Sequence, residues 1–451
     1  MRVVVIGGGI SGLACGHGLA TELPDHDVHV LEASDRPGGV IGTTTVGGYR
    51  FDDGPGGWLN RDDSTQRLLE AVGLAGSVIE GRTGNRRRYV WREGKLRRFP
   101  SDFKSFLTTD LLSVTAKLRL LAEPWISWDS GDDDTDVATL FERRIGHEAM
   151  RALIDPVLAG IYAGRPEDLG VRATLPAIAK LAANRRSFVK QALASRKSGA
   201  GVGGGYGSLR HGMGALPEAL SEALGERFVP NAPVAAICRD GDRWAVSVGG
   251  SETREIIADA VVVATPARVS ERLIGDLDPE LESFFASVPT SPVAVVGLGY
   301  GVEDSPSLRG YGHLVPSTED GPVLGVLWSS SIFEGRAEQG VSLRVILGGW
   351  RDLEIHTRDD DALTRIARGA LESSLGITAE PEAQSVARHP QGLPQYGVGH
   401  LERVDSLRGT LKRYPGLFVI GNAVHGVGVN ACTTAAARAV TGVADYCRSL
   451  V

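Results

Sequence analysis

The chain has 451 residues and a formal net charge of −7, with 48 basic and 55 acidic side chains. This balance disfavours a nucleic-acid partner, because binding phosphates requires a concentrated positive face. Hydrophobic residues make up 42% of the chain and the mean hydropathy is −0.05, as in a globular protein of two or three domains. The four cysteines form no CxxC pair, so we expect a reducing, cytoplasmic location and no metal site.

A glycine-rich turn follows the first apolar segment. Residues 2–6 are largely β-branched, as in a buried parallel strand, and the next six residues have the spacing GxGxxG. Residues 13–23 then have the pattern of a helix, and a second apolar segment ends in Glu32. Such glycines permit a tight turn, close approach of a pyrophosphate and close packing of helix on strand. We therefore predict a dinucleotide site in which Glu32 accepts hydrogen bonds from a ribose, the alternative being a glycine turn without a ligand.

The residues after Glu32 indicate that the bound dinucleotide is FAD and not NAD. Arg36 and the pair Gly38-Gly39 follow the acid directly, and residues 53–57 (DGPGG) form a further glycine-rich loop. This arrangement resembles the second signature of glutathione-reductase-type FAD proteins, in particular the amine oxidase and desaturase branch. The resemblance implies that the glycine pair passes close to FAD, that Arg36 orients the loop, and that residues 53–57 lie near the flavin. For Asp53 alone, a surface turn is an equally good interpretation.

The middle of the chain divides into segments of different pattern. Residues 86–99 alternate basic and apolar side chains, which predicts a two-stranded ribbon turning at residues 93–94. Residues 102–194 are mostly helical, and their apolar face has lysine and arginine nearby, so they form either a cap on the core or a membrane-surface element. A parallel strand closing the FAD domain is expected at 259–266. A separate mixed sheet is expected from strands at 293–300, 323–328 and 343–347.

A second glycine-rich turn lies near the end of the chain. Residues 416–422 (GLFVIGN) predict a strand, and residues 426–430 (GVGVN) and a helix of small residues at 433–443 follow it. The N–H groups at the start of such a helix can hold the negative charge that a reduced flavin carries near N1 and C2=O. We therefore expect the flavin end of the cofactor here.

Over essentially its whole length, the chain resembles the FAD-dependent, oxygen-using protoporphyrinogen and coproporphyrinogen oxidase family. The resemblance lies in residues 155–164 (DPVLAGIYAG), 169–174 (LGVRAT), 310–316 (GYGHLVP), 343–349 (LRVILGG), 394–396, 399–401 and 421–430 (GNAVHGVGVN). It implies an α/β fold with a Rossmann-like FAD-binding domain of the glutathione-reductase type, a mixed-sheet substrate domain and a helical cap. The expected segments are 1–85, 199–275 and 401–451 for FAD, 86–100 and 276–400 for substrate, and 101–198 for the cap.

The motifs and the resemblance together assign non-covalent FAD binding to residues near both glycine-rich turns. These are Gly7, Gly8, Gly9, Ile10, Ser11, Gly12, Glu32, Ala33, Arg36, Gly38, Gly39, Val40, Gly54, Pro55, Gly56, Gly57, Val234, Ala264, Leu401, Gly421, Asn422, Val427, Gly428 and Val429. The resemblance further implies that Tyr311 and Leu314 pack on one side of a tetrapyrrole, with Val157, Gly160 and Ile346 shaping the rest. Leu314 and Ile346 are equally well explained as strand-core residues. No catalytic acid or base is assigned, because the flavin carries the chemistry.

Two positions depart from the family pattern. Gly56 stands where some members have an Arg or Asn that meets a substrate propionate, and Ala431 replaces a common acid. Glycine cannot bind a propionate through a side chain, so charge recognition must come from elsewhere. The unranked candidates are Arg61, Arg92, Arg97 and Arg98. His425 lies near the flavin by sequence, but we expect a structural role for it.

The resemblance implies oxidation of protoporphyrinogen IX to protoporphyrin IX in haem biosynthesis, with six electrons leaving in three steps and O₂ becoming H₂O₂. Coproporphyrinogen III, oxidised to coproporphyrin III, is the alternative substrate. Another amine oxidase or desaturase, or a non-catalytic binding protein with this fold, are further alternatives; the complete pyrophosphate turn argues against the last. The implied partners are the porphyrinogen, O₂, the inner face of the cell membrane as a peripheral contact, a second copy in a homodimer, and a ferrochelatase that receives the product.

Overall fold

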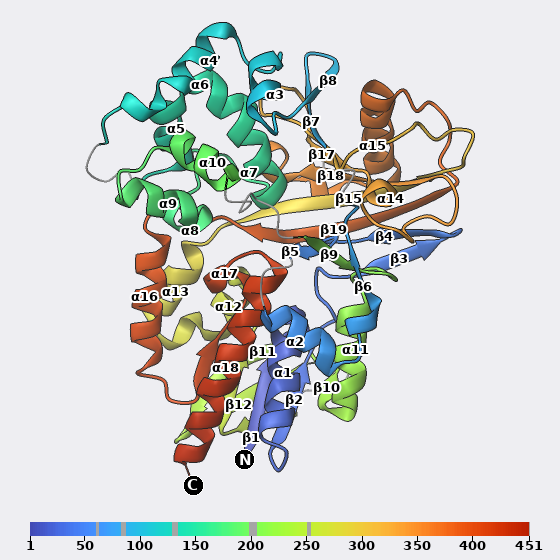
Figure 1. Ribbon diagram of the computed structural model, residues 1–451. Coiled ribbons are helices and arrows are strands. Elements are labelled where there is room, and N and C mark those ends of the chain that lie inside the picture. Colours follow the sequence, from blue (N-terminus) through green and yellow to red (C-terminus); the bar gives the residue numbers. More distant parts are fainter. Residues whose placement is uncertain (60–62, 83–86, 129–133, 198–204, 250–253, 451) are drawn as a thin grey trace.

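A computed structural model of the protein describes residues 1–59, 63–82, 87–128, 134–197, 205–249 and 254–450. A five-stranded parallel sheet with the order β10-β2-β1-β14-β20 forms the lower part of the molecule in Figure 1, where both termini lie. Its strands are β1 (Arg2–Ile6), β2 (Asp27–Leu31), β10 (Phe228–Val229), β14 (Ala260–Val263) and β20 (Leu417–Val419). The parallel strand expected at 259–266 is present as β14, which lies between β1 and β20.

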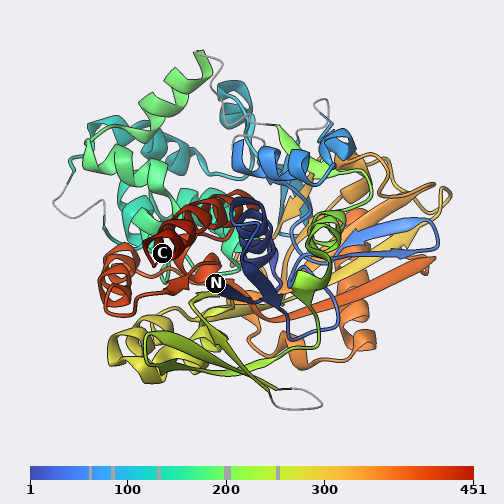
Figure 2. The same cartoon turned by 90° about the horizontal axis from the view of Figure 1, so that it is seen from below.

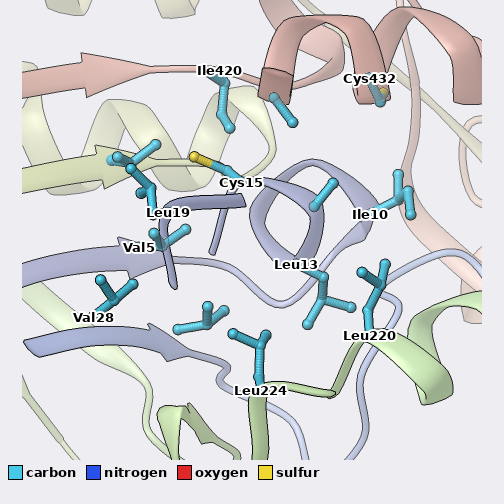
Figure 3. Close-up of a cluster of buried hydrophobic side chains, with 14 of the residues drawn as sticks. Val5, Ile10, Leu13, Cys15, Leu19, Val28, Leu220, Leu224, Ile420 and Cys432 are labelled. Carbon is cyan, nitrogen blue, oxygen red and sulfur yellow. The ribbon is translucent and has the colours of Figure 1, made fainter. Parts of the chain in front are cut away.

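Both faces of the parallel sheet are covered. Val3 and Val5 of β1 pack toward α1 (Ile10–Glu22) and α18 (Val429–Ser449), whereas Val4 and Ile6 pack toward the opposite layer, which includes Trp244. Successive side chains of a strand point to opposite faces, so an unbroken β-branched run fits a sheet buried on both sides. Figure 3 shows the first of these clusters, with Leu13 and Leu19 of α1 beside strand valines.

Helices α1 and α18 lie side by side on the sheet, as the view in Figure 2 shows. They pack tightly at Gly18, where an added Cβ would lie 2.6 Å from Cγ2 of Val440. Helix α1 follows the carboxyl end of β1, and α18 follows β20 after the short helix α17 (Asn422–His425). The N-termini of both helices therefore open at the same edge of the sheet, where open α/β sheets bind their ligands.

A seven-stranded mixed sheet forms the second layer, in the order β19-β15-β18-β17-β16-β7-β8. The expected ribbon is confirmed as β7 and β8, and it joins this sheet through a parallel pairing of β7 with β16. Strand β19 was not predicted, because its sequence AQSVARHPQGLP has no regular alternation of apolar residues. The strands are β7 (Arg88–Arg92), β8 (Lys95–Arg98), β15 (Thr290–Tyr300), β16 (Gly312–Leu314), β17 (Val323–Leu327), β18 (Val341–Gly348) and β19 (Ala383–Pro394).

A group of helices covers the outer end of this sheet, at the top of Figure 1. The helical character expected for residues 102–194 is confirmed in the described part of that segment, whose apolar side chains form a cluster of their own. Among the residues that the structure describes, no helix is both long enough and apolar enough to cross a bilayer. The helices are α3 (Phe103–Thr108), α4 (Val114–Leu121), α5 (Val137–Ile145), α6 (His147–Ala149), α7 (Asp155–Tyr162), α8 (Val171–Thr174), α9 (Pro176–Ala183) and α10 (Phe188–Lys197).

The remaining elements connect these layers. The strands are β3 (Thr43–Val46), β4 (Tyr49–Asp52), β5 (Trp58–Leu59), β6 (Val78–Glu80), β9 (Tyr206–Leu209), β11 (Val234–Asp240), β12 (Arg243–Val248) and β13 (Arg254–Ala258). The helices are α2 (Asp63–Ala71), α11 (Ala215–Leu224), α12 (Ala267–Ile274), α13 (Pro279–Ala286), α14 (Ser329–Ile332), α15 (Asp360–Leu375) and α16 (His400–Leu411). Segments far apart in sequence contribute to the five-stranded and seven-stranded sheets, whereas β3-β4 and β11-β12-β13 form local sheets.

Candidate functional site

The three spaced glycines of the first turn have three different environments. Gly7 has φ +106°, a conformation that favours glycine, and a Cβ added to Gly12 would lie 1.9 Å from the carbonyl oxygen of Gly7. These two glycines are required by the turn and by the packing of helix on strand. At Gly9, in contrast, an added Cβ would meet no atom within 4 Å. The middle glycine therefore borders open space, as a residue next to a pyrophosphate must.

The start of α1 has free donors at this point. Gly9 is the N-cap residue and no side chain caps the helix, so the first-turn N–H groups and their partial positive charge remain for a ligand. Glu32 is fixed beside the turn, because its carboxylate accepts bonds from the Gly8 N–H (2.6 Å), the Ser34 N–H (2.8 Å) and the Ser34 hydroxyl (2.7 Å). A carboxylate has about four acceptor positions, so room for one ribose hydroxyl remains.

The second glycine-rich loop is held against the first turn. The Gly38 N–H donates to the Gly8 carbonyl at 2.7 Å, and Arg36 donates to the carbonyls of Gly39 (2.9 Å) and Ile41 (3.2 Å). Arg36 thus orients this loop, as the resemblance implies. The loop at 53–57 packs on it in turn, because a Cβ at Gly54 would lie 2.1 Å from the Val40 carbonyl oxygen.

The C-terminal turn repeats the features of the first. Gly421 has φ +113°, Gly428 is the N-cap of α18 without a capping side chain, and a Cβ at either would meet no atom within 4 Å. Tyr396, whose role the sequence did not reveal, donates its hydroxyl hydrogen to the Asn422 carbonyl and stacks on His400 with ring centroids 4.4 Å apart. Tyr396 therefore positions the turn that precedes α18.

Two uncapped helix N-termini and three glycines that border open space lie at one sheet edge, and this cradle fits an FAD. The turn at Gly9 would hold the pyrophosphate, Glu32 the ribose, and the start of α18 the flavin. Of the other residues predicted to bind FAD, Ala264 contacts the first turn, since its carbonyl oxygen lies 2.9 Å from a Cβ added to Gly7. Leu401 is 36% exposed in the first turn of α16, and its role in binding FAD stays a prediction.

The residues predicted to shape a substrate pocket gather on α7, β16 and β18, with one exception. A Cβ at Gly160 of α7 would lie 2.8 Å from Cδ2 of Leu314, and Ile346 packs in an apolar cluster with Val295 and other residues. Val157 lies one helical turn before Gly160 on α7. Tyr311 lies apart, with its ring 6.4 Å from the ring of Tyr206.

His425 is the titratable side chain within the C-terminal turn, residues 421–430. Burial lowers the pKa of His425 to about 4, which makes its imidazole a weak proton acceptor, and its Nδ1 has no hydrogen-bond partner among the described residues. Across the described ranges, no group of three or more His, Cys, Asp and Glu residues could hold a metal ion.

Comparisons with known proteins agree with this geometry. A family model described as flavin containing amine oxidoreductase matches residues 10–444. Coproporphyrinogen III oxidase of Bacillus subtilis is 28% identical over 99% of this chain and 98% of its own length. Protoporphyrinogen oxidase of Homo sapiens is 30% identical over 98% of both chains.

Solved structures show the same fold. A crystal structure from Exiguobacterium sp., provisionally named a protoporphyrinogen oxidase, has a TM-score of 0.85, 26% sequence identity and coverage of 98% of both chains. Cyclohexylamine oxidase from Brevibacterium oxydans, at 18% identity, covers 99% of both chains with a TM-score of 0.72 and supports the fold alone. The protein is an FAD-dependent oxidoreductase. Because the family model spans nearly all of the chain, it belongs to the flavin-containing amine oxidoreductase family.

Proposed function

We propose that the protein oxidises protoporphyrinogen IX to protoporphyrin IX, with O₂ as the electron acceptor. The observation that carries this proposal is that relatives matched over 96–99% of this chain are named porphyrinogen oxidases. The overall change removes six electrons and six hydrogens from the macrocycle, while three O₂ become three H₂O₂. Ile346, which is partly buried and packs on the apolar cluster of Ala159, Val293, Val295 and Leu324, is proposed to meet the macrocycle.

In this reaction the protein binds and orients FAD and the porphyrinogen and excludes water from both. When bound, FAD supplies the two-electron acceptor that O₂ restores after each step. The chain contributes a cradle of backbone N–H groups for the cofactor and an apolar surface for the macrocycle. Exclusion of water strengthens each electrostatic contact within the site and limits side reactions of the porphyrinogen.

Coproporphyrinogen III is the second candidate substrate, because bacterial relatives at 28–30% identity are named for it. The two porphyrinogens differ in propionate and vinyl groups, so charge in the pocket decides between them. Initial rates on both substrates, followed by the fluorescence of the porphyrin product, test the assignment. We expect protoporphyrinogen IX to be oxidised faster. A higher rate with coproporphyrinogen III would transfer the proposal to that substrate, and no product with either would refute both.

Gly160→Ala should impair the substrate pocket and leave FAD binding intact. The new Cβ would lie 2.8 Å from Cδ2 of Leu314, so the end of the Leu314 side chain must shift. That displacement costs about 0.5–1.5 kcal/mol, so we expect kcat/KM to fall roughly 2- to 10-fold with an unchanged flavin content. Gly369→Ala in α15 is the control, because its Cβ meets no atom within 4 Å and the gain in helix propensity is the same. Equal kinetics in the two variants would contradict this placement of Gly160.

The outer end of the cap is proposed as a peripheral membrane contact. Its large apolar side chains are exposed on α3, α4 and the turn that follows: Phe103, Leu107, Val114, Leu118 and Trp125. Leu118 and Val114 are four residues apart, so they share one face of α4, and Lys104 is exposed nearby. Apolar residues beside a cation are typical of helices that lie in a membrane interface.

Substitution on this face tests the contact. With Leu118→Ser and Trp125→Ser together, binding to vesicles of mixed neutral and anionic lipid should weaken more than about tenfold, since each buried side chain contributes about 1.5–3 kcal/mol. Leu353→Ser is the control, because Leu353 is as exposed as Leu118, at 62%, but lies outside the cap. If the variants and the wild-type protein sediment equally with vesicles, the proposed membrane contact is refuted.

The domain boundaries, a homodimer and transfer of product to a ferrochelatase stay predictions.

A further inference from the structure

Arg344 of β18 is a buried cation on the face of the sheet that carries the substrate cluster. Alternate residues of β18 point to opposite faces: Leu343, Val345 and Leu347 pack in the cluster that includes α15, while Arg344 and Ile346 point the other way. Arg344 is paired with Gly297 on β15, from which no side chain covers it, and with Leu327 on β17. The Arg344 side chain is only 3% exposed.

The hydrogen bonds of Arg344 use one edge of its guanidinium. Nη1 donates to the carbonyl oxygens of Asp52 and of Gly54, the latter at 3.0 Å. Nε is buried without any partner, and no hydrogen bond to Nη2 forms among the described residues. Nε and Nη2 lie on the same edge of the group, and their N–H bonds form the parallel fork that matches a carboxylate.

The charge of Arg344 is also not neutralised by the protein. The nearby carboxylate of Asp52 already pairs with buried Arg336 at 3.1 Å and accepts further bonds from Thr43 and the Met213 N–H. Within the described ranges, no carboxylate lies at ion-pair distance from Arg344. A buried charge without a partner is costly, so this arrangement is expected where a ligand brings the missing anion.

A small void lies beside Arg344. This void of about 10 Å³, enough for one water-sized oxygen, is bordered by Arg344, by Arg336 and its partner Asp52, and by Gly56, Tyr206 and Phe333 among others. A Cβ at Gly56 would lie 3.0 Å from Nη2, so the absence of a side chain there leaves the fork uncovered. Tyr206 in turn neighbours Tyr311.

We propose that Arg344 binds a propionate carboxylate of the porphyrinogen through Nε and Nη2. This inference rests on the proposed substrate class. A propionate brings the full negative charge that the site lacks, whereas an oxidised flavin is neutral. The other candidate arginines are occupied elsewhere: Arg92 donates to the Leu111 carbonyl and Arg97 pairs with Glu93 and Asp110. Arg98 is exposed at the edge strand β8, and Arg61 lies outside the described residues.

Binding of coproporphyrin III and of its tetramethyl ester to the FAD-loaded enzyme tests the proposal, because only the acid carries carboxylates. Wild-type protein should bind the acid at least about tenfold more tightly. Arg344→Gln should raise the Kd of the acid roughly 10- to 100-fold and leave that of the ester within about twofold. Arg344→Lys should recover only part of the loss, because lysine has no fork. Absorption titrations of the porphyrin give each Kd.

Arg351→Gln is the matched control, since Arg351 also donates to two carbonyls (Val323 at 2.8 Å and Val315 at 2.6 Å) and has an Nε without a partner. It should leave the acid-to-ester ratio unchanged. Equal affinity of wild-type protein for acid and ester overturns the proposal without any variant. Loss of FAD from Arg344→Gln with an unchanged ratio would assign Arg344 to the cofactor instead. If wild-type protein binds neither porphyrin, the proposed function fails, and the assignment of Arg344 fails with it.

Discussion

Gly9→Val should yield a folded protein that no longer retains FAD. Gly9 has φ −71° and ψ 174°, which valine adopts without strain, and a Cβ there meets no protein atom within 4 Å. The added side chain instead fills the space that a pyrophosphate needs at the start of α1. Losing two charge-assisted hydrogen bonds of about 1.5–3 kcal/mol each weakens binding by at least about 100-fold. Flavin absorbance per mole of purified protein, and FAD titration of the apoprotein, measure this loss.

Gly76→Val is the control for this variant. Its Cβ also meets no atom within 4 Å, but Gly76 lies in a short helical turn after α2, away from both glycine-rich turns. It should be purified with the flavin content of the wild-type protein. If Gly9→Val retains FAD with wild-type affinity, the pyrophosphate does not lie at Gly9, and the first turn is structural only.

The cofactor half of the site could be predicted from the sequence because its requirements are local. Gly7 needs a positive φ and Gly12 needs space for a neighbouring carbonyl, and both needs exclude other residue types whatever surrounds them. The β-branched runs of β1 and β14 likewise indicated a sheet buried on both faces. The sequence did not indicate that β20 would add beyond β14, since neighbour order in a sheet depends on distant contacts.

The other half of the site depends on contacts between distant segments. Arg344 meets the carbonyl of Asp52 across 292 residues, and Tyr396 meets that of Asn422 in another element. In the sequence, Arg344 and Tyr396 are single residues within a strand or loop. Neither belongs to a motif whose spacing would identify it as functional. Burial and the absence of a counter-charge distinguish Arg344, and both become visible only when the sheets are assembled.

The second large effect is expected in the cap, where Glu123 and Arg144 form a buried ion pair with side chains 0% and 1% exposed. Glu123 accepts from Nε of Arg144 at 3.1 Å and from the N–H groups of Phe188 and Val189, both at 3.2 Å. Arg144 also lies over the ring of Trp128 at 3.8 Å. Glu123→Gln leaves a buried guanidinium without its counter-charge, so we expect a loss of about 3–5 kcal/mol in the free energy of unfolding.

Urea denaturation followed by tryptophan fluorescence measures this loss, and Trp128 reports on the pair directly. The control is Glu142→Gln, because Glu142 is 37% exposed and its pairing with His147 is worth less than about 1 kcal/mol. The pH dependence of the free energy of unfolding provides an independent check on the ion pair. Burial raises the pKa of Glu123, but hydrogen bonds from Ser187 and Arg144 outweigh it and hold the pKa below its usual value of 4.5.

A carboxyl whose pKa is lower in the folded state stabilises the fold above its unfolded pKa, and this stabilisation is lost as the pH falls through the folded value. The wild-type protein should therefore lose stability below about pH 4.5 more steeply than Glu123→Gln, which has no such carboxyl. The two curves should converge in acid because protonated Glu123 resembles glutamine. If the variant is as stable as the wild-type protein at neutral pH, the pair does not stabilise the cap, and the apolar cluster around Phe141 and Phe188 must hold these helices together instead.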